Sequence, residues 1–137
     1  MSTVRPSLVD TSAWIAALRP DGSAVARRLV GDVLEVGLAV TADPVLAELA
    51  VGVRCQKERA ELLDLLGALP RLPVDSGVWD AAAELGVRAR GAGVTAPLVD
   101  LLIAHLALEA DFEVLHADNH FVLLAEVVSL RQRWALG

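Results

Sequence analysis

The sequence predicts an α/β fold, a three-layer sandwich in which a mainly parallel central sheet carries helices on both faces. At 137 residues the chain is the size of one domain with a substantial core, so we expect residues 1–137 to form a single domain. Hydrophobic residues make up 55% of it and aromatic residues only 4%, a composition that suits buried parallel strands. Short apolar segments alternate with longer helical ones, as expected for parallel strands joined by helical crossovers.

The first strand and the first helix are expected at residues 7–10 and 11–18. SLVD is a short apolar run that ends in an acid, and TSAWIAAL follows with hydroxyl residues suited to a helix start. A second helix is expected over residues 22–35, because its apolar and basic residues fall on opposite faces. GLAVT, residues 37–41, then has the composition of a strand.

The next helix is expected to run from Asp43 to about Cys55. Asp43 is its expected cap, and Pro44 stands at the first helical position, where proline is best tolerated. Residues 56–69 form a strongly amphipathic pattern, typical of a helix that serves as scaffold or interface. The residues expected on the buried face of this helix are Leu62, Leu63, Leu65, Leu66 and Leu69.

RLPV, residues 71–74, is interpreted as a third strand. Asp75 or Ser76 then begins a helix that ends in the glycines of RGAGV. The loop at residues 91–97 is the segment expected to be most mobile.

The last elements are a helix, a strand and a short helix. Thr95 and Pro97 precede the helix LVDLLIAHLALEA, residues 98–110. FEVLHA, residues 112–117, is a strand, and HFVLLA, residues 120–125, is the short helix that follows it.

Four acidic residues differ from most of the others, which lie on solvated helical faces. Asp10 and Asp118 each follow a predicted strand, whereas Glu48 and Asp100 lie in helices among apolar neighbours. Each is expected beside buried surface, where an unpaired carboxylate needs a compensating partner. Strand ends and the starts of the following helices share one edge of a parallel sheet, so we expect all four acids to point into one crevice.

A purely structural interpretation of these acids remains open. Asp10 and Asp118 could simply cap the helices that follow them. Asp100 is close enough to a helix start to reach free backbone amides, while Glu48 has no evident cap to make. The coincidence of four such residues at one edge favours a shared function.

Converging carboxylates without His or Cys indicate a hard, oxygen-only site that suits Mg²⁺ or Mn²⁺. The chemistry that needs this arrangement is phosphodiester hydrolysis, in which metal-activated water attacks while the metal charge stabilises the anionic phosphate. Either two metals or one metal would serve.

The formal net charge of −6 argues against a nucleic-acid binder, but bound divalent cations would reverse the local sign. No run approaches the roughly 20 apolar residues of a membrane helix, and the N-terminus lacks the apolar stretch of a secretory signal. We therefore expect a cytoplasmic protein without a membrane partner. The single Cys55 cannot form an internal disulfide and is expected in the core.

With these residues in place, the chain resembles the PIN-domain family, and within it the VapC toxins of bacterial toxin-antitoxin pairs. The resemblance covers nearly the whole chain and rests on four segments: LVDTSAWIAAL, AELAVG, APLVDLLIAHLAL and VLHADNHFVLLA. It implies one PIN domain over residues 1–137, Mg²⁺ or Mn²⁺ dependence and endonucleolytic cleavage of RNA, often tRNA or ribosomal RNA. It also implies a homodimer and inhibition by a cognate VapB antitoxin.

The resemblance further implies roles for single residues. The acidic quartet of catalytic residues and metal ligands is matched by Asp10, Glu48, Asp100 and Asp118. Ser12 matches an accessory hydroxyl that would position water or a ligand. Many relatives carry one more acid just before the Phe, where this chain has Asn119 and His120, and this departure leaves a second metal position poorly filled. His120 is expected in a loop facing solvent, with a phosphate contact as the alternative.

Other residues rank lower as candidates. His116 is expected to be packed in its strand, and His105 to be structural or at an interface. Trp14 and Trp79 are expected to be core or dimer anchors rather than base-stacking platforms. Candidates for contacts with an RNA backbone are Arg5, Arg19, Arg27, Arg28, Arg88 and Arg90.

Two other functions stay open. One is a catalytically silent PIN-like module that binds a protein partner. The other is a metal-dependent phosphatase or nuclease with a different substrate, because the same cluster can hydrolyse other phosphate esters.

Overall fold

A computed structural model of the chain describes residues 4–137 and contains a five-stranded sheet in the order β3-β2-β1-β4-β5. Every strand pairing in it is parallel, which confirms the predicted mainly parallel α/β fold. The strands are β1 (Ser7–Val9), β2 (Ala39–Ala42), β3 (Arg71–Leu72), β4 (Glu113–His116) and β5 (Gln132–Trp134). β1 lies between β2 and β4, so the ends of these three strands are neighbours.

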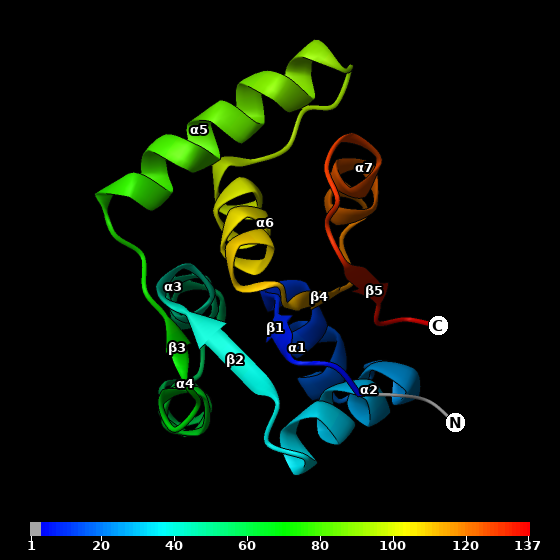
Figure 1. Cartoon of the computed structure of the whole chain (residues 1–137). Helices are drawn as coiled ribbons and strands as arrows, with labels where there is room; N and C mark the ends of the chain where they lie inside the picture. Colours follow the sequence, from blue (N-terminus) through cyan, green and yellow to red (C-terminus); the bar gives the residue numbers. More distant parts are fainter. Residues whose placement is uncertain (1–3) are drawn as a thin grey trace.

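Helices connect the strands and form the outer two layers. They are α1 (Thr11–Leu18), α2 (Ala24–Glu35), α3 (Asp43–Gly52), α4 (Gln56–Gly67), α5 (Ser76–Gly91), α6 (Leu98–Ala110) and α7 (Asn119–Val127). Figure 1 shows α1, α2 and α4 on one side of the sheet and α5, α6 and α7 on the other, with α5 lying across α6. This arrangement confirms the predicted layers.

Side-chain caps fix most of the helix starts. Asp10, Ser23, Asp75 and Asp118 each accept a hydrogen bond from a backbone N–H in the first turn of the following helix. The predicted cap of α3 was wrong, because Asp43 is the first residue of the helix and the cap position holds Ala42, which has no side-chain oxygen. Pro44, predicted at the first helical position, is the second residue of α3 and so lies in its first turn.

The core is centred on the central strands and α6, and the other helices contribute their buried faces to it. Leu8, Val9, Val114 and Leu115 in β1 and β4 are at most 1% exposed, because both faces of these strands are covered by helices. Most of α6 is buried as well. The central strands therefore place their carboxyl ends on a rigid, close-packed support.

Two predictions about burial were wrong. Cys55 is exposed rather than packed in the core. Of the α4 leucines expected to be buried, only Leu66 is; Leu65 is 43% exposed. Trp79 is 49% exposed on α5, which excludes the core and leaves its predicted alternative, a dimer anchor, untested; Trp14 is buried.

The sequence interpretation also missed the edge strand β5, whose short segment QRW has no apolar run.

Within residues 4–137, none of the helices has the length and apolar content needed to cross a bilayer.

Candidate metal centre

The four predicted acids all lie where strands end and helices begin. Asp10 follows β1, and Asp118 follows β4. Glu48 lies in α3, the helix after β2, and Asp100 lies in the first turn of α6. The sheet order makes the three strand ends neighbours, so the acids approach one another from four different elements.

Asp10 is almost fully buried, with 3% of its surface exposed. Its Oδ2 accepts hydrogen bonds from the Ser12 backbone N–H at 3.0 Å and from the Ser12 hydroxyl at 2.5 Å. Its Oδ1 is buried and has no hydrogen-bond partner among the described residues. Burial raises the pKa of Asp10, the bonds from Ser12 lower it, and the negative charge of Asp118 raises it further. Capping therefore accounts for only one of the two carboxylate oxygens.

Ser12 connects two ends of the site. Its hydroxyl donates to Asp10 and accepts a hydrogen bond from the Ala117 backbone N–H at 2.9 Å. Ala117 lies between β4 and Asp118. The hydroxyl thus joins the end of β1 to the end of β4, which gives Ser12 a structural function, and its accessory role toward water or a ligand stays a prediction.

Asp100 is 7% exposed, and its Oδ2 has no hydrogen-bond partner in the described part of the chain. Burial raises the pKa of Asp100 to about 8, with additional contributions from the negative charges of Asp118, Asp10 and Glu48. The carboxylates of Asp10, Glu48 and Asp118 are therefore all close enough to that of Asp100 to repel it. The predicted convergence of the four acids agrees with this geometry.

Asp118 is held by the backbone of its own turn. Its Oδ1 accepts a hydrogen bond from the His120 backbone N–H at 2.9 Å, as in an ordinary helix cap. Its own N–H donates to His116 Nδ1 at 3.1 Å. The carboxylate also lies 2.8 Å, through Oδ1, from His120 Nδ1. The predicted cap and the predicted site position therefore coexist in one residue.

Glu48 differs from the expectation for it. Its side chain is exposed rather than surrounded by buried surface, because it lies on the outer side of α3. Its Oε1 accepts a hydrogen bond from the Thr11 hydroxyl at 2.8 Å. Thr11 directly follows Asp10, so this bond holds the exposed carboxylate at the edge of the buried ones. The sequence interpretation did not single out Thr11 for this role, although its place beside Asp10 was a usable signal.

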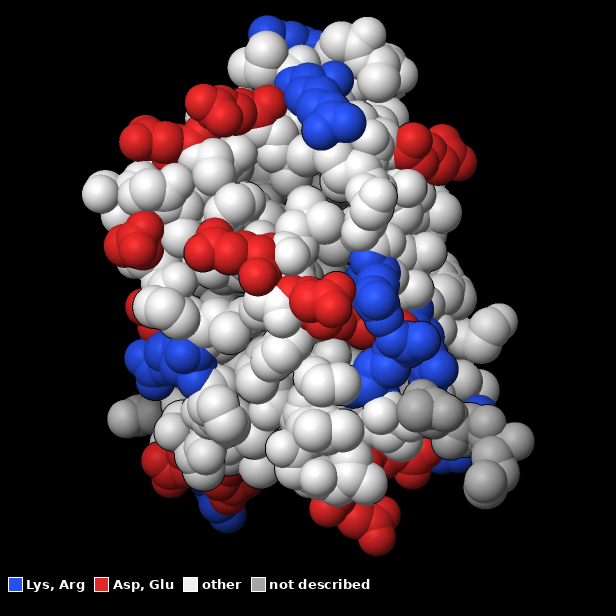
Figure 2. Space-filling model, viewed as in Figure 1, with Lys and Arg blue, Asp and Glu red and all other residues white. Residues whose placement is uncertain are grey.

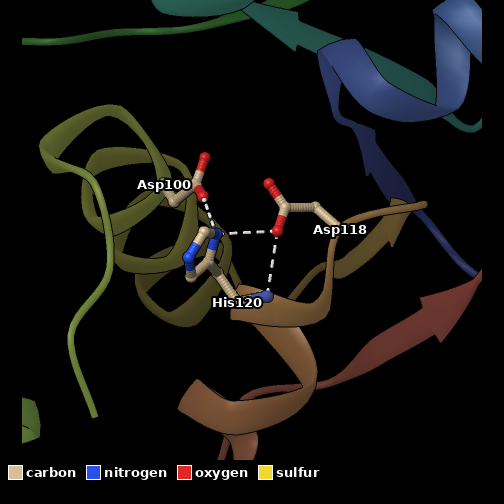
Figure 3. A group of neighbouring side chains, drawn as sticks. All are labelled: Asp100, Asp118 and His120. Atoms are coloured by element: carbon tan, nitrogen blue, oxygen red, sulfur yellow. Dashed lines mark hydrogen bonds and ion pairs between the residues drawn. The ribbon is translucent and has the colours of Figure 1, made fainter.

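His120 is the main correction to the predicted site. It was expected in a loop facing solvent, but it lies in the first turn of α7 with its side chain 38% exposed. Figure 3 shows its imidazole turned toward Asp100 and Asp118. Nδ1 lies 3.1 Å from Asp100 Oδ2 and 2.8 Å from Asp118 Oδ1. The acids were predicted to converge because the first turn of a helix that follows a strand faces this edge of the sheet. His120 lies in such a turn, so the same reasoning applied to it.

These three residues form a cluster that could hold a metal ion. One donor atom each from Asp100, Asp118 and His120 lies within 4.8 Å of the other two. Asp10 and Glu48 do not belong to this tightest set, so they lie around it rather than in it. The expected carboxylates are thus accompanied by an imidazole nitrogen, which the expectation of an oxygen-only site did not include.

The other two histidines have structural contacts. His116 is fully buried as predicted, and its Nε2 lies 2.7 Å from Gln132 Oε1. Burial lowers the pKa of His116, so the ring is neutral and its Nδ1 accepts the Asp118 N–H. His105 Nε2 lies 2.9 Å from Glu109 Oε2 on the same helix.

A groove of about 550 Å³ begins at Glu48 and runs between α1, α3 and α4. Apolar side chains line much of it, including those of Ile15, Leu18 and Leu65. The exposed leucines of α1 and α4 are thus part of one concave surface.

The predicted RNA-contacting arginines are all exposed. On the face drawn in Figure 2, acidic side chains are scattered and the larger basic group lies at the right of the view. Arg5, Arg28 and Arg133 line a pocket of about 340 Å³ together with Asp32 and Glu113. Basic charge on this face is therefore local and mixed with acids.

Comparison with known proteins gives consistent matches. The PIN domain family model matches residues 7–127. Ribonuclease VapC11 of Mycobacterium tuberculosis is 33% identical over 129 residues, which are 90% of this chain and 95% of that protein.

Two solved structures are similar over nearly their whole length. The VapBC-5 structure, a member of the VapBC family of toxin-antitoxin systems from Mycobacterium tuberculosis, is 26% identical with a TM-score of 0.62, covering 94% of this chain and 98% of that one. The VapBC2 structure from Rickettsia felis, bound to a DNA fragment from its promoter, has a TM-score of 0.72 at 18% identity, covering 93% and 96%. At that identity the second likeness shows the fold alone.

Proposed function

The chain belongs to the PIN-domain family, among the VapC ribonucleases, and we propose that it is a metal-dependent endoribonuclease that acts as the toxin of a toxin-antitoxin pair. In this proposal residues 1–137 act as one PIN domain that hydrolyses phosphodiester bonds of RNA, with tRNA or ribosomal RNA as the substrate class. The observation that carries it is the pair of buried carboxylates, Asp10 and Asp100, each with an oxygen that no described residue satisfies.

These oxygens fit a divalent cation. Buried carboxylates without partners cost free energy, and the repulsion that raises the pKa of Asp100 is relieved by a positive charge between the acids. The donors are carboxylate oxygens with one imidazole nitrogen, a set that accepts Mg²⁺ or Mn²⁺. Asp100 and Asp118 would hold the ion, with Asp10 beside them.

A bound Mg²⁺ or Mn²⁺ supplies Lewis acidity, which makes water a nucleophile at neutral pH and stabilises the charge on the phosphate. The protein residues supply position. Ser12 fixes one oxygen of Asp10 and leaves the other free to face the site. Thr11 holds Glu48 at the solvent-facing edge, where we assign it the orientation of the attacking water and the acceptance of its proton.

The proposal also includes a protein partner, a VapB-type antitoxin. The chain's fold is that of toxins solved as VapBC complexes. The groove that includes Glu48 is apolar along Leu18 and Leu65. Its charged lining residues are Glu48, Glu58, Glu61, Arg19 and Arg54. These features suit an antitoxin segment that combines apolar residues with charges of both signs, and its binding would cover one carboxylate of the site. Homodimerisation remains a prediction.

The test is cleavage of total RNA by the purified chain with Mg²⁺ or Mn²⁺, with EDTA and the Asp10→Asn variant as controls. Asp80→Asn, an exposed acid on α5, is a matched variant that should cleave like the wild type. The proposal is supported if the wild type and Asp80→Asn cleave RNA in the presence of metal, and if Asp10→Asn and the samples with EDTA do not. No cleavage at full metal occupancy would favour the silent interaction module, and equal activity on DNA or a simple phosphate ester would favour the broader hydrolase.

A further inference from the structure

The imidazole of His120, a residue outside the predicted quartet, lies between two acids of that quartet, Asp100 and Asp118. Nδ1 lies 2.8 Å from Asp118 Oδ1 and 3.1 Å from Asp100 Oδ2, and the three atoms come from two helices and a strand end. Figure 3 shows the second ring nitrogen pointing away from both carboxylates. Only Nδ1 is therefore turned toward the acids.

These distances match the spacing of neighbouring donors on one ion. Two ligands at right angles, each about 2.1 Å from a divalent cation, lie about 3 Å apart. Both distances from His120 Nδ1 are close to that value.

The contacts are poor hydrogen bonds, although they are short. Neither has the angle of a hydrogen bond, so Asp100 Oδ2 and His120 Nδ1 are both buried polar atoms without a hydrogen-bond partner among the described residues. The side chain of Asp100 is only 9% exposed, so water gives this oxygen little compensation. The two unsatisfied atoms face the same space, and a shared ligand would satisfy both.

We propose that His120 is a ligand of the metal ion through Nδ1, together with Asp100 and Asp118, and that this nitrogen makes the centre prefer Mn²⁺ to Mg²⁺. Mg²⁺ is a hard ion that favours oxygen donors, whereas imidazole donors suit the transition metals better. The inference rests on the proposed function, because it assigns a ligand of the same metal centre.

A rival interpretation makes the opposite prediction. If the imidazole merely takes the place of a cation between the carboxylates, a metal ion would have to displace it. Removing the side chain would then strengthen metal binding, whereas removing a ligand weakens it. The sign of the change in affinity therefore separates the two.

The experiment is titration of the purified chain with Mn²⁺ and separately with Mg²⁺, followed calorimetrically, for the wild type and His120→Ala. We expect His120→Ala to bind Mn²⁺ at least about tenfold more weakly, since even residues behind the ligands change metal affinity by that factor. Mg²⁺ affinity should fall less, so the ratio of the two affinities should fall. His105→Ala, which removes a histidine that contacts Glu109 instead, should bind both ions like the wild type.

Pulsed electron paramagnetic resonance of bound Mn²⁺ gives a second measurement that does not depend on activity. The wild type should show modulation from a directly bound ¹⁴N, which shifts when the histidines carry ¹⁵N. The signal should be absent in His120→Ala and in His120→Asp. His120→Asp should still bind Mn²⁺, through a carboxylate oxygen, and its affinity for Mg²⁺ relative to Mn²⁺ should rise. Because this variant still binds metal, its loss of the nitrogen signal cannot be attributed to misfolding.

The outcomes distinguish two failures. Unchanged or tighter Mn²⁺ binding by His120→Ala, or a nitrogen signal that persists in it, would overturn the assignment of His120 while leaving a carboxylate centre in place. If Asp100→Asn and Asp118→Asn also leave Mn²⁺ binding unchanged, the metal centre of the proposed function fails.

Discussion

Ser12 Oγ lies 2.5 Å from Asp10 Oδ2, so one oxygen of this buried carboxylate is fixed by a hydroxyl that also accepts the Ala117 N–H. Replacing Ser12 by Ala removes both bonds and leaves the Ala117 N–H without this partner. We expect the free energy of unfolding to fall by about 1–3 kcal/mol, measured by urea denaturation in EDTA. Ser12→Thr keeps the hydroxyl and should lose less. Equal stability of the Ala variant and the wild type would mean that water replaces the link.

The raised pKa of Asp100 predicts that metal-free protein becomes less stable as pH rises. The carboxyl is neutral in the folded protein up to about pH 8 but ionised in the unfolded chain above about pH 4. The unfolded chain therefore binds fewer protons over this interval, and stability falls as pH rises toward 8. His116 has the opposite effect on stability, but only below about pH 6.5. There the unfolded ring is protonated, and because burial lowers the pKa of the folded ring, stability falls as pH falls.

The measurement is the free energy of unfolding in EDTA between pH 6.5 and 9, for the wild type and for Asp100→Asn. The variant should fold, and its free energy of unfolding should depend less on pH than that of the wild type. At pH 8.5 the variant should be more stable than the wild type by on the order of 1–3 kcal/mol. An Asp100→Asn protein that is unfolded throughout would show that this carboxylate is structural instead.

Metal should stabilise the protein because it binds the folded site and not the unfolded chain. At a metal concentration about 100 times the dissociation constant the gain is about 2.7 kcal/mol. We expect Mg²⁺ or Mn²⁺ to raise the melting temperature, EDTA to reverse the rise, and Asp10→Asn to reduce it. An Asp10→Asn protein that responds to metal like the wild type would place the ion elsewhere.

Glu48→Gln separates a catalytic role from a structural one. Glu48 is exposed and its contact with Thr11 can be kept by the amide oxygen of Gln, so stability should change by less than about 0.5 kcal/mol. RNA cleavage should fall by about 100-fold or more if the carboxylate accepts a proton. Glu61→Gln, exposed in the same groove, should retain activity. Full activity of Glu48→Gln would remove this residue from the chemistry.

Much of the fold could be predicted because its signals are local. Helix starts at Ser23 and Asp75 follow from side chains that reach amides within their own turn. The buried strands are continuous apolar runs, since both of their faces are covered. β5 lacked this signal, because an edge strand pairs on one side only and QRW needs no apolar pattern.

Burial of single side chains was harder to predict. Leu65 and Cys55 are apolar but exposed. For Leu65 the reason is that its side of α4 lines an open groove instead of being covered by another layer. Glu48 has apolar neighbours in sequence, yet its own side of α3 faces solvent. Periodicity identifies a face of a helix but not what that face meets.

The sequence by itself determined the alternation of strands and helices, and with it the edge of the sheet where Asp10, Asp100 and Asp118 had to approach one another. Only the tertiary structure decided which atoms lie within reach of a single ion, and it placed the His120 nitrogen beside two carboxylates. The physical reason is that strand order and chain direction decide at which edge of the sheet a residue lies, but not where its side-chain atoms lie. Coordination depends on differences of about 1 Å, which are fixed by how the helices pack on the sheet.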